Sequence, residues 1–243
     1  MSSLRVPVDT DTIREDFDAI AELTQTATGV LDLHARWVRS QVPAGCRILD
    51  LGCGTGQLSR ALAGAAREVV GLDVSPRMIE VATQSSAAHS NLRYVNAEFM
   101  AWQHAETFDC VVSVAALHHL PVSPALGKIV TVLRPGGRLL VVDLVSAWAP
   151  SEIPHSAFAF LAKRWRHRRS GDDVDPRLRA AWRRHGHHDR LLSLRQIRRA
   201  YRDALPGAIV TRQPSWRYRA TWTKTTSPLD LALGVRSSRW VRS

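Results

Sequence analysis

The stretch ILDLGCGTG at residues 48–56 decides the fold of this chain. It begins as an apolar run and passes through three glycines at alternate positions, and residues 58–66 follow it with helical spacing of apolar side chains. A short buried strand, a glycine-rich turn and a helix, in this order, open a β-α-β unit. The turn lies at the carboxyl end of the strand, where open α/β sheets bind their ligands.

Two residues argue against a dinucleotide as that ligand. The dinucleotide pattern G-x-G-x-x-G requires a glycine where this chain has Gln57, because the third glycine comes one residue early. Asp50 stands two residues before the first glycine, and its carboxylate would repel the negative charge of a pyrophosphate. A ligand with a positive ammonium or sulfonium group suits this carboxylate.

Strands and helices continue to alternate up to about residue 145. Ser75 and Pro76 form the cap-then-proline pattern of a helix start, and Pro135, Gly136 and Gly137 stop a helix expected over residues 123–133. Five strands separated by helical stretches predict a parallel sheet with right-handed crossovers. The expected strands are 47–51, 68–73, 92–95, 108–114 and 138–143.

The segments outside this core complete the expected architecture. Residues 9–40 show two amphipathic helices, a helix begins at Ser193, and residues 208–212 and 215–224 alternate as an antiparallel hairpin would. We therefore expect an α/β fold, with a doubly wound, mostly parallel seven-stranded sheet, a C-terminal antiparallel hairpin and a helical lid. The expected regions are an N-terminal helical lid (1–42), a cofactor-binding core (43–146), a helical insertion over the substrate (147–192), and a core completion with tail (193–243).

The composition is that of a globular protein with one large domain. The chain has 243 residues, of which 45% are hydrophobic and 23% are charged. No apolar run reaches the roughly 20 residues of a membrane span, and the first residues lack the apolar segment of a secretory signal, so a cytoplasmic location and no membrane partner are expected. The three cysteines (Cys46, Cys53, Cys110) lie in or beside apolar runs and are read as small buried side chains.

Charge is distributed unevenly along the chain. Residues 1–150 carry a net charge of −3, whereas residues 151–243 carry +14. One interpretation is a basic surface for nucleic acid or for an anionic substrate. The other is that the base composition of the genome favours arginine codons. The sequence leaves both open.

Five motifs in register resemble those of class I S-adenosylmethionine-dependent methyltransferases, in particular the small-molecule group with the ubiquinone and menaquinone enzymes. The first is residues 48–56, the second is Asp73 after its strand, and the third is residues 96–98. The fourth-strand motif is residues 108–112, and the last, residues 133–140, contains the Pro-Gly-Gly turn. The resemblance covers residues 43–145 and, more weakly, 193–224.

The resemblance implies S-adenosyl-L-methionine as the cofactor. Asp73 would accept hydrogen bonds from both ribose hydroxyls, and residues 96–98 would present a polar side chain and a backbone N–H to the adenine. Met78 packs against the adenine or belongs to the core. The cofactor-binding residues expected in this way are Asp50, Gly52, Cys53, Gly54, Thr55, Gly56, Asp73, Val74, Met78, Asn96, Ala97, Glu98 and Val114.

His118 and Asp143 are the candidate catalytic residues. They follow neighbouring strands, so a histidine oriented by an aspartate would lie over the acceptor pocket and act as a general base. The other interpretation makes His118 and His119 part of the scaffold and the pocket wall. The triplet of His187, His188 and Asp189 is interpreted as a solvated connection between helices; metal binding is the alternative, and no metal is expected.

The expected function is methyl transfer to oxygen or nitrogen of a small molecule of secondary metabolism, such as a polyketide-, peptide- or quinone-like compound. Two alternatives remain: an RNA or protein methyltransferase that uses the basic C-terminal part, and a non-catalytic regulator that binds the cofactor. A nucleic-acid partner is not expected, and a monomer or a homodimer would both fit. Five aromatic residues of the insertion would enclose a flat acceptor or form a small core of the lid: Trp148, Phe158, Phe160, Trp165 and Trp182.

Overall fold

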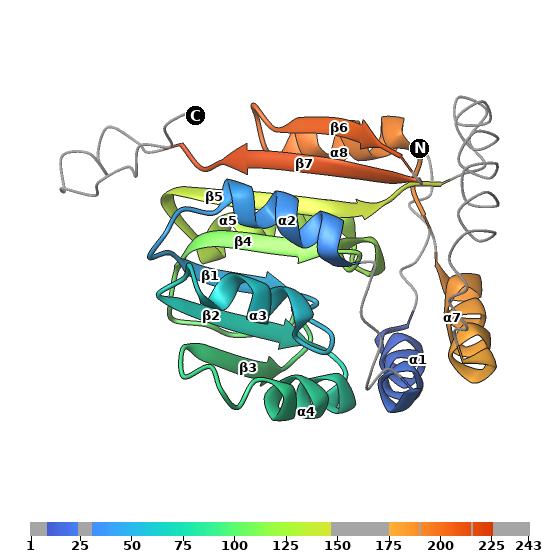
Figure 1. Cartoon of the computed structure of the whole chain (residues 1–243). Coiled ribbons are helices and arrows are strands. Elements are labelled where there is room, and N and C mark those ends of the chain that lie inside the picture. Colours follow the sequence, from blue (N-terminus) through green and yellow to red (C-terminus); the bar gives the residue numbers. More distant parts are fainter. Residues whose placement is uncertain (1–8, 24–30, 147–174, 190, 215, 226–243) are drawn as a thin grey trace.

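A computed structural model describes residues 9–23, 31–146, 175–189, 191–214 and 216–225 of the chain. These residues form a seven-stranded sheet in the order β3-β2-β1-β4-β5-β7-β6 (Figure 1). Strands β1 to β5 are parallel, and β7 runs antiparallel to both β5 and β6. The expected doubly wound sheet with its C-terminal hairpin is thereby confirmed. The strands are β1 (Arg47–Leu51), β2 (Glu68–Asp73), β3 (Leu92–Asn96), β4 (Phe108–Val114), β5 (Leu133–Leu144), β6 (Ile209–Gln213) and β7 (Arg217–Thr223).

Helices cover both faces of the sheet because the strands carry apolar side chains on both faces. Ile48, Val69 and Leu140 face a core that α2 and α3 close, while Leu49, Val70 and Leu139 face a core with side chains from α5 and α8. The helices are α1 (Thr10–Leu23), α2 (Leu31–Gln41), α3 (Gln57–Ala63), α4 (Pro76–Ser85), the short 3-10 helix η1 (Leu117–His119), α5 (Val122–Val132), α7 (Pro176–His188) and α8 (Leu194–Ala204).

Helix starts follow the expected caps, and one strand is longer than expected. The Ser75 hydroxyl accepts the N–H of Met78 at the start of α4, and Ser193 forms a capping box with Gln196 at the start of α8. Strand β5 begins at Leu133 rather than at residue 138. The Pro-Gly-Gly segment is therefore an irregular part of the strand, where the pairing with β4 shifts register.

Helices α1 and α7 lie side by side beyond the carboxyl ends of the parallel strands, at the right of Figure 1. Helix α1 also packs against α4, so it approaches the loops that follow β1 and β2. Trp182 of α7 is 47% exposed. The other four aromatic residues of the expected insertion lie outside the described residues. Among the helices of the described ranges, none has the length and apolarity that crossing a membrane requires.

The glycine-rich turn requires residues without side chains. Gly52, Gly54 and Gly56 all have positive φ angles, of 72°, 51° and 77°. Gly52 also lies against the loop after β4, since a Cβ atom on it would come within 2.2 Å of the Cβ of Ala116. The turn thus combines a left-handed backbone with a close approach of two loops.

We predict that Gly52→Ala destabilises the protein more than Gly45→Ala. Both glycines have nearly the same positive φ angle, but a Cβ atom on Gly45 would meet nothing within 4 Å. The control should therefore cost only the conformational term of about 1–2 kcal/mol, and Gly52→Ala about 1–3 kcal/mol more for the overlap. Urea unfolding measures both free energies. Equal losses would show that the contact with Ala116 does not constrain the turn.

Candidate active site

The carboxylate of Asp73, at the end of β2, links the loops that follow β1 and β2. Its Oδ2 atom accepts the backbone N–H of Gly54 at 2.9 Å, and its Oδ1 atom accepts that of Ser75 at 3.0 Å. Burial is the largest influence and raises the pKa of Asp73, although these N–H groups oppose the shift. A carboxylate offers about four acceptor positions, so the N–H groups leave acceptor capacity for the ribose hydroxyls expected there.

Asp50 lies beneath the glycine turn. It is 1% exposed, and its Oδ2 atom accepts the hydroxyl group of Ser59 in α3 at 2.6 Å. Burial, followed by repulsion from Asp73, raises the pKa of Asp50 to about 7 against the effect of the Ser59 hydroxyl. A positively charged ligand at the turn would stabilise both buried carboxylates in their ionised form. This environment fits a cofactor with ammonium and sulfonium groups.

The turn also leaves space for a ligand to approach its backbone. A Cβ atom on Gly54 would have the Met78 sulfur as its nearest neighbour, at 4.0 Å. Met78 itself is buried in a small cluster with Ile20 and Leu178, and its contact with the adenine stays a prediction. Its sulfur nevertheless faces the turn, where the cofactor was expected.

Two of the three residues expected at the adenine make hydrogen bonds within the protein. The side-chain amide of Asn96 donates to the carbonyl groups of Asp73 and Val74, at 3.1 Å and 2.9 Å. The backbone N–H of Ala97 donates to the carbonyl of Asp73 at 3.0 Å. These bonds fix the loop after β3 against the loop after β2. Glu98, the next residue, is half-buried at the same sheet edge.

The remaining expected residues also lie at this edge. Cys53 and Thr55 belong to the glycine turn, and Val114 ends β4, the strand beside β1. The sequence analysis did not identify Asp18 of α1, whose Oδ1 atom accepts the Ser75 hydroxyl at 2.5 Å. Nor did it identify Tyr94, whose hydroxyl lies 2.4 Å from where a Cβ atom on Gly56 would be. No motif in the sequence marks either residue.

The fold brings His118 and Asp143 into contact. The Nδ1 atom of His118 lies 2.6 Å from Oδ1 of Asp143, and the backbone N–H of His118 donates to Oδ2 at 2.8 Å. Both side chains are buried. Burial is the largest single influence and lowers the pKa of His118, but the attraction and hydrogen bonding of Asp143, and then of Asp189, together outweigh it and raise the pKa to about 9. Asp143 thus orients the imidazole through Nδ1 and leaves Nε2 for other partners.

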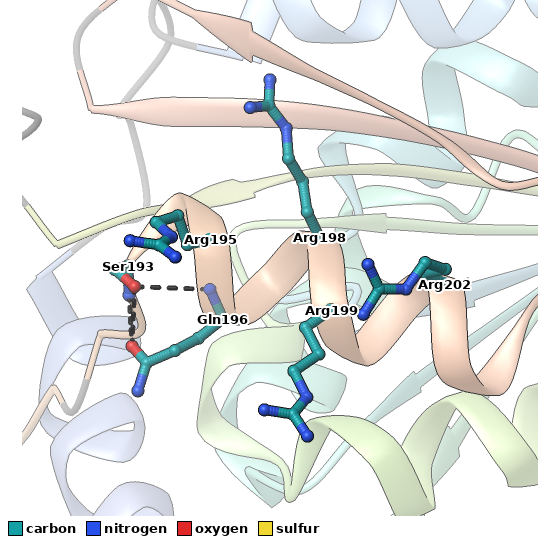
Figure 2. Close-up of a pocket in the computed structure, with 6 residues that line it drawn as sticks. All are labelled: Ser193, Arg195, Gln196, Arg198, Arg199 and Arg202. Atoms are coloured by element: carbon teal, nitrogen blue, oxygen red, sulfur yellow. Dashed lines mark hydrogen bonds between the residues drawn. The ribbon is translucent and has the colours of Figure 1, made fainter.

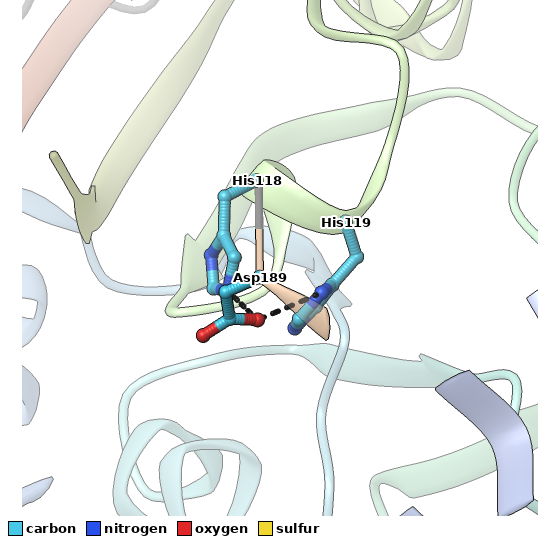
Figure 3. A group of neighbouring side chains, drawn as sticks. All are labelled: His118, His119 and Asp189. Atoms are coloured by element: carbon cyan, nitrogen blue, oxygen red, sulfur yellow. Dashed lines mark ion pairs between the residues drawn. The ribbon is translucent and has the colours of Figure 1, made fainter. Parts of the chain in front are cut away.

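A wider cluster of histidines and aspartates surrounds Nε2 of His118. Asp189, which follows α7, approaches His118 and His119 (Figure 3). His185 of α7 bridges two aspartates. Its Nε2 atom lies 3.5 Å from Oδ1 of Asp189, and its Nδ1 atom lies 3.4 Å from Oδ2 of Asp16 in α1. Burial, as the largest cause, lowers the pKa of His119 to about 2. Side chains from α1, η1 and α7 therefore meet at one buried point.

The sequence identified only part of this cluster. Within the triplet 187–189, Asp189 joins His118, whereas the His187 side chain is exposed. Asp16 and His185 were not expected there, although both are almost fully buried. Ala115, between β4 and the histidines, has a positive φ angle of 55°, which a residue with a Cβ atom seldom adopts. Strained backbone of this kind is concentrated at functional sites.

A second concave surface lies on the outer face of α8, away from these residues. Figure 2 shows it lined by Ser193 and Gln196 together with exposed arginines. Its volume is about 620 Å³. Arg199 and Arg202 pair with Asp203, at 3.6 Å and 3.3 Å, so part of this charge is compensated. Its arginines are Arg195, Arg198, Arg199 and Arg202.

Comparison with known proteins agrees with this geometry. Residues 48–137 match a family model described as a methyltransferase domain. Over 147 residues the chain is 31% identical to a ubiquinone biosynthesis O-methyltransferase of Xanthomonas axonopodis pv. citri; the match covers 58% of this chain and 61% of that protein. The chain thus spans about three fifths of the length of this curated relative.

Two solved structures share the fold. The N-methyltransferase NodS of Bradyrhizobium japonicum, in complex with S-adenosyl-L-homocysteine, has a TM-score of 0.58 at 18% identity; the match covers 87% of this chain and 99% of NodS. The complex of DhpI with S-adenosyl-L-homocysteine has a TM-score of 0.62 at 19% identity, with 89% and 98% covered.

We predict that Asp50 makes the stability of the ligand-free protein fall as the pH rises from about 4 to 7. In this range the unfolded chain has lost the proton that the folded protein keeps on Asp50, so unfolding releases a proton and a higher pH favours it. Three pKa units correspond to about 4 kcal/mol. Urea unfolding of Asp50→Asn at several pH values should lack this component.

Ser59→Ala is the matched control. Its hydroxyl stabilises the ionised carboxylate, so its loss should raise the pKa of Asp50 further and extend the decline in stability to higher pH. A pH dependence that is the same in the wild type and in Asp50→Asn would contradict the assignment.

Proposed function

We propose that this chain, whose residues 48–137 match a methyltransferase domain, is a class I S-adenosylmethionine-dependent methyltransferase that transfers a methyl group from S-adenosyl-L-methionine to an oxygen atom of a small molecule. The observation that carries the proposal is the glycine turn above two buried carboxylates, Asp50 and Asp73. This arrangement suits a cationic nucleoside and disfavours a dinucleotide. The match to a relative whose name specifies O-methylation supports oxygen as the acceptor atom.

In this proposal, each part of the sheet edge binds one part of the cofactor. Asp73 accepts the ribose hydroxyls while it keeps its bonds to Gly54 and Ser75. Glu98 faces the adenine, since the donors of Asn96 and Ala97 are engaged within the protein. The remaining residues of the turn (Gly52, Cys53, Thr55 and Gly56), with Asp50, Val74, Met78 and Val114, surround the methionine part and the base.

The residues at the acceptor side would position a hydroxyl group and remove its proton. When bound, S-adenosylmethionine supplies a methyl group that its sulfonium already activates, so alignment of the acceptor supplies much of the rate. We propose that the neutral form of His118 accepts the hydroxyl proton at Nε2, with Asp143 fixing the imidazole from the other side. Because the pKa of His118 is raised to about 9, the imidazole must first release its own proton, so this step becomes faster as the pH rises toward 9. The loop that carries His118 touches the glycine turn through Ala116, which supports placing the acceptor beside the cofactor.

An RNA or protein acceptor is the second candidate. The exposed arginines on the outer face of α8 favour it, because they present positive charge to a polyanion. The small-molecule proposal ranks first because the arginines are far from the proposed methyl donor. Helix α8 packs against α5 and β6, whereas the glycine turn follows β1.

We predict that Asp73→Ala weakens the binding of S-adenosyl-L-homocysteine by about 2–4 kcal/mol, as expected for the loss of two hydrogen bonds to a charged group. Isothermal titration calorimetry measures this change. Asp109→Ala is the matched control, because it removes a carboxylate that accepts the N–H of Arg47 at the opposite ends of the strands. Equal weakening in both variants, or none in a folded Asp73→Ala, would place the ribose elsewhere.

We predict that the wild-type protein, incubated with S-adenosylmethionine and hydroxylated quinone-like compounds or a metabolite extract, yields products heavier by one methylene group. His118→Ala should reduce this turnover by about 10²–10⁴ and leave the affinity for S-adenosyl-L-homocysteine unchanged. Asp143→Asn should cause a smaller loss of the same kind, because the imidazole stays but loses its orientation.

Mass spectrometry of the products and calorimetry of each variant test this. Full activity in both variants would remove His118 and Asp143 from the reaction. Binding of S-adenosyl-L-homocysteine without transfer to any acceptor would favour a non-catalytic binding protein.

A further inference from the structure

Three side chains on two distant segments of the chain offer a set of metal ligands. His118 and His119 lie on η1, and Asp189 follows α7, seventy residues further along. One atom from each side chain lies within 4.8 Å of the other two. Two imidazoles and one carboxylate are a common ligand set for divalent transition-metal ions. The spacing of these residues in the sequence does not show that they meet.

The distances are too long for hydrogen bonds and close to those between ligands of one ion. Oδ1 of Asp189 is 3.6 Å from Nε2 of His118 and 3.7 Å from Nδ1 of His119, whereas N–H···O bonds measure about 2.7–3.2 Å. Ligands about 2.0–2.1 Å from a tetrahedral zinc ion lie roughly 3.3–3.4 Å apart. The two distances to Asp189 would need to shorten by a few tenths of an ångström, whereas the two histidine nitrogens, which lie within 4.8 Å of each other, would need to approach by up to about 1.4 Å.

The Oδ1 atom of Asp189 makes no hydrogen bond. It is buried, and in the described part of the chain its neighbours are three ring nitrogens at ion-pair distances of 3.5–3.7 Å. A buried carboxylate oxygen without a hydrogen bond is costly, and these longer contacts relieve only part of that cost. An ion placed between the oxygen and the two histidines of η1 would supply a direct bond.

The surroundings are those of a metal-binding histidine. His118 directs its second nitrogen, Nδ1, to the carboxylate of Asp143 at 2.6 Å, which fixes the ring and leaves Nε2 for a ligand bond. The side chains of His118, His119 and Asp189 are 7%, 10% and 14% exposed, so the cluster is enclosed but not sealed.

We propose that His118, His119 and Asp189 bind a divalent transition-metal ion such as Zn²⁺. Three protein ligands leave a coordination position open, as in catalytic rather than structural zinc sites. The role of the ion rests on the proposed function: an acceptor hydroxyl at the open position has its pKa lowered, so that its proton leaves to water. His118 then acts on the acceptor through the ion.

The test measures metal binding directly. Metal-free protein is dialysed against Zn²⁺ and its metal content is determined, and Co²⁺ is added in parallel because its visible absorption reports on nitrogen and oxygen ligands. The wild type should bind one ion per chain. His119→Ala and Asp189→Asn should weaken binding by more than about 100-fold, and Asp143→Asn by about 10–100-fold, the usual effect of removing an outer partner. His104→Ala, which removes a histidine outside the cluster, should bind as the wild type does.

The outcomes separate the metal site from the proposed function. Absence of stoichiometric Zn²⁺ and Co²⁺ binding in the wild type, or unchanged binding in both His119→Ala and Asp189→Asn, overturns the metal site. If methyl transfer persists in that case, the proposed function stands and His118 accepts the proton directly. Because a ligand variant can unfold, the melting temperature of the wild type with Zn²⁺ and with a chelator is a second measurement. Zn²⁺ should raise it, and no rise would contradict the site.

Discussion

The hydrogen bonds of Asp73 hold together the edge of the sheet where the cofactor is proposed to bind. One carboxylate accepts N–H groups from the turn after β1 and from the start of α4, and its own backbone carbonyl accepts the N–H of Ala97 after β3. Three loops are thereby fixed by a single residue. Burial raises the pKa of Asp73 and of the nearby Asp50, so negative charge is held at this edge at a cost that the N–H groups on Asp73 offset only in part. A cationic ligand would offset that cost.

Helices α1 and α7 add a second constraint on the other side of the site. Asp16 of α1 lies between Arg184 and His185 of α7, at 3.2 Å and 3.4 Å, and Phe17 packs against the rings of His119 and His185. Asp18, on the same helix, bonds to Ser75 at the start of α4. Helix α1 therefore touches both the proposed cofactor edge and the histidine cluster. Movement of this helix would affect the two together.

The strands could be predicted from the sequence because most are buried on both faces and read as unbroken apolar runs between glycines and prolines. The hairpin was equally clear, since Trp222 and Tyr218 alternate with polar residues along β7. Asp73, His118 and Asp143 could be placed because each ends or follows a strand, and parallel strands share one edge.

The histidine cluster could not be predicted in the same way. Asp16 and His185 are 169 residues apart in sequence. Helical periodicity shows which face of a helix is apolar, but it does not show which helix packs against it. The run of His187, His188 and Asp189 is conspicuous in the sequence and His185 is not, yet His185 is buried and His187 is exposed, because the two lie on different sides of α7. The hydrogen bonds of Asn96 and Ala97 in the loop after β3 also depend on local geometry that sequence spacing does not encode.

Calorimetric titration of the ligand-free protein with S-adenosyl-L-homocysteine and, separately, with NAD tests the central claim most directly. The claim is that the glycine turn above Asp50 and Asp73 selects a nucleoside without a pyrophosphate. It predicts saturable binding of S-adenosyl-L-homocysteine with one site per chain and no measurable binding of NAD under the same conditions. Binding of NAD more tightly than S-adenosyl-L-homocysteine would contradict it.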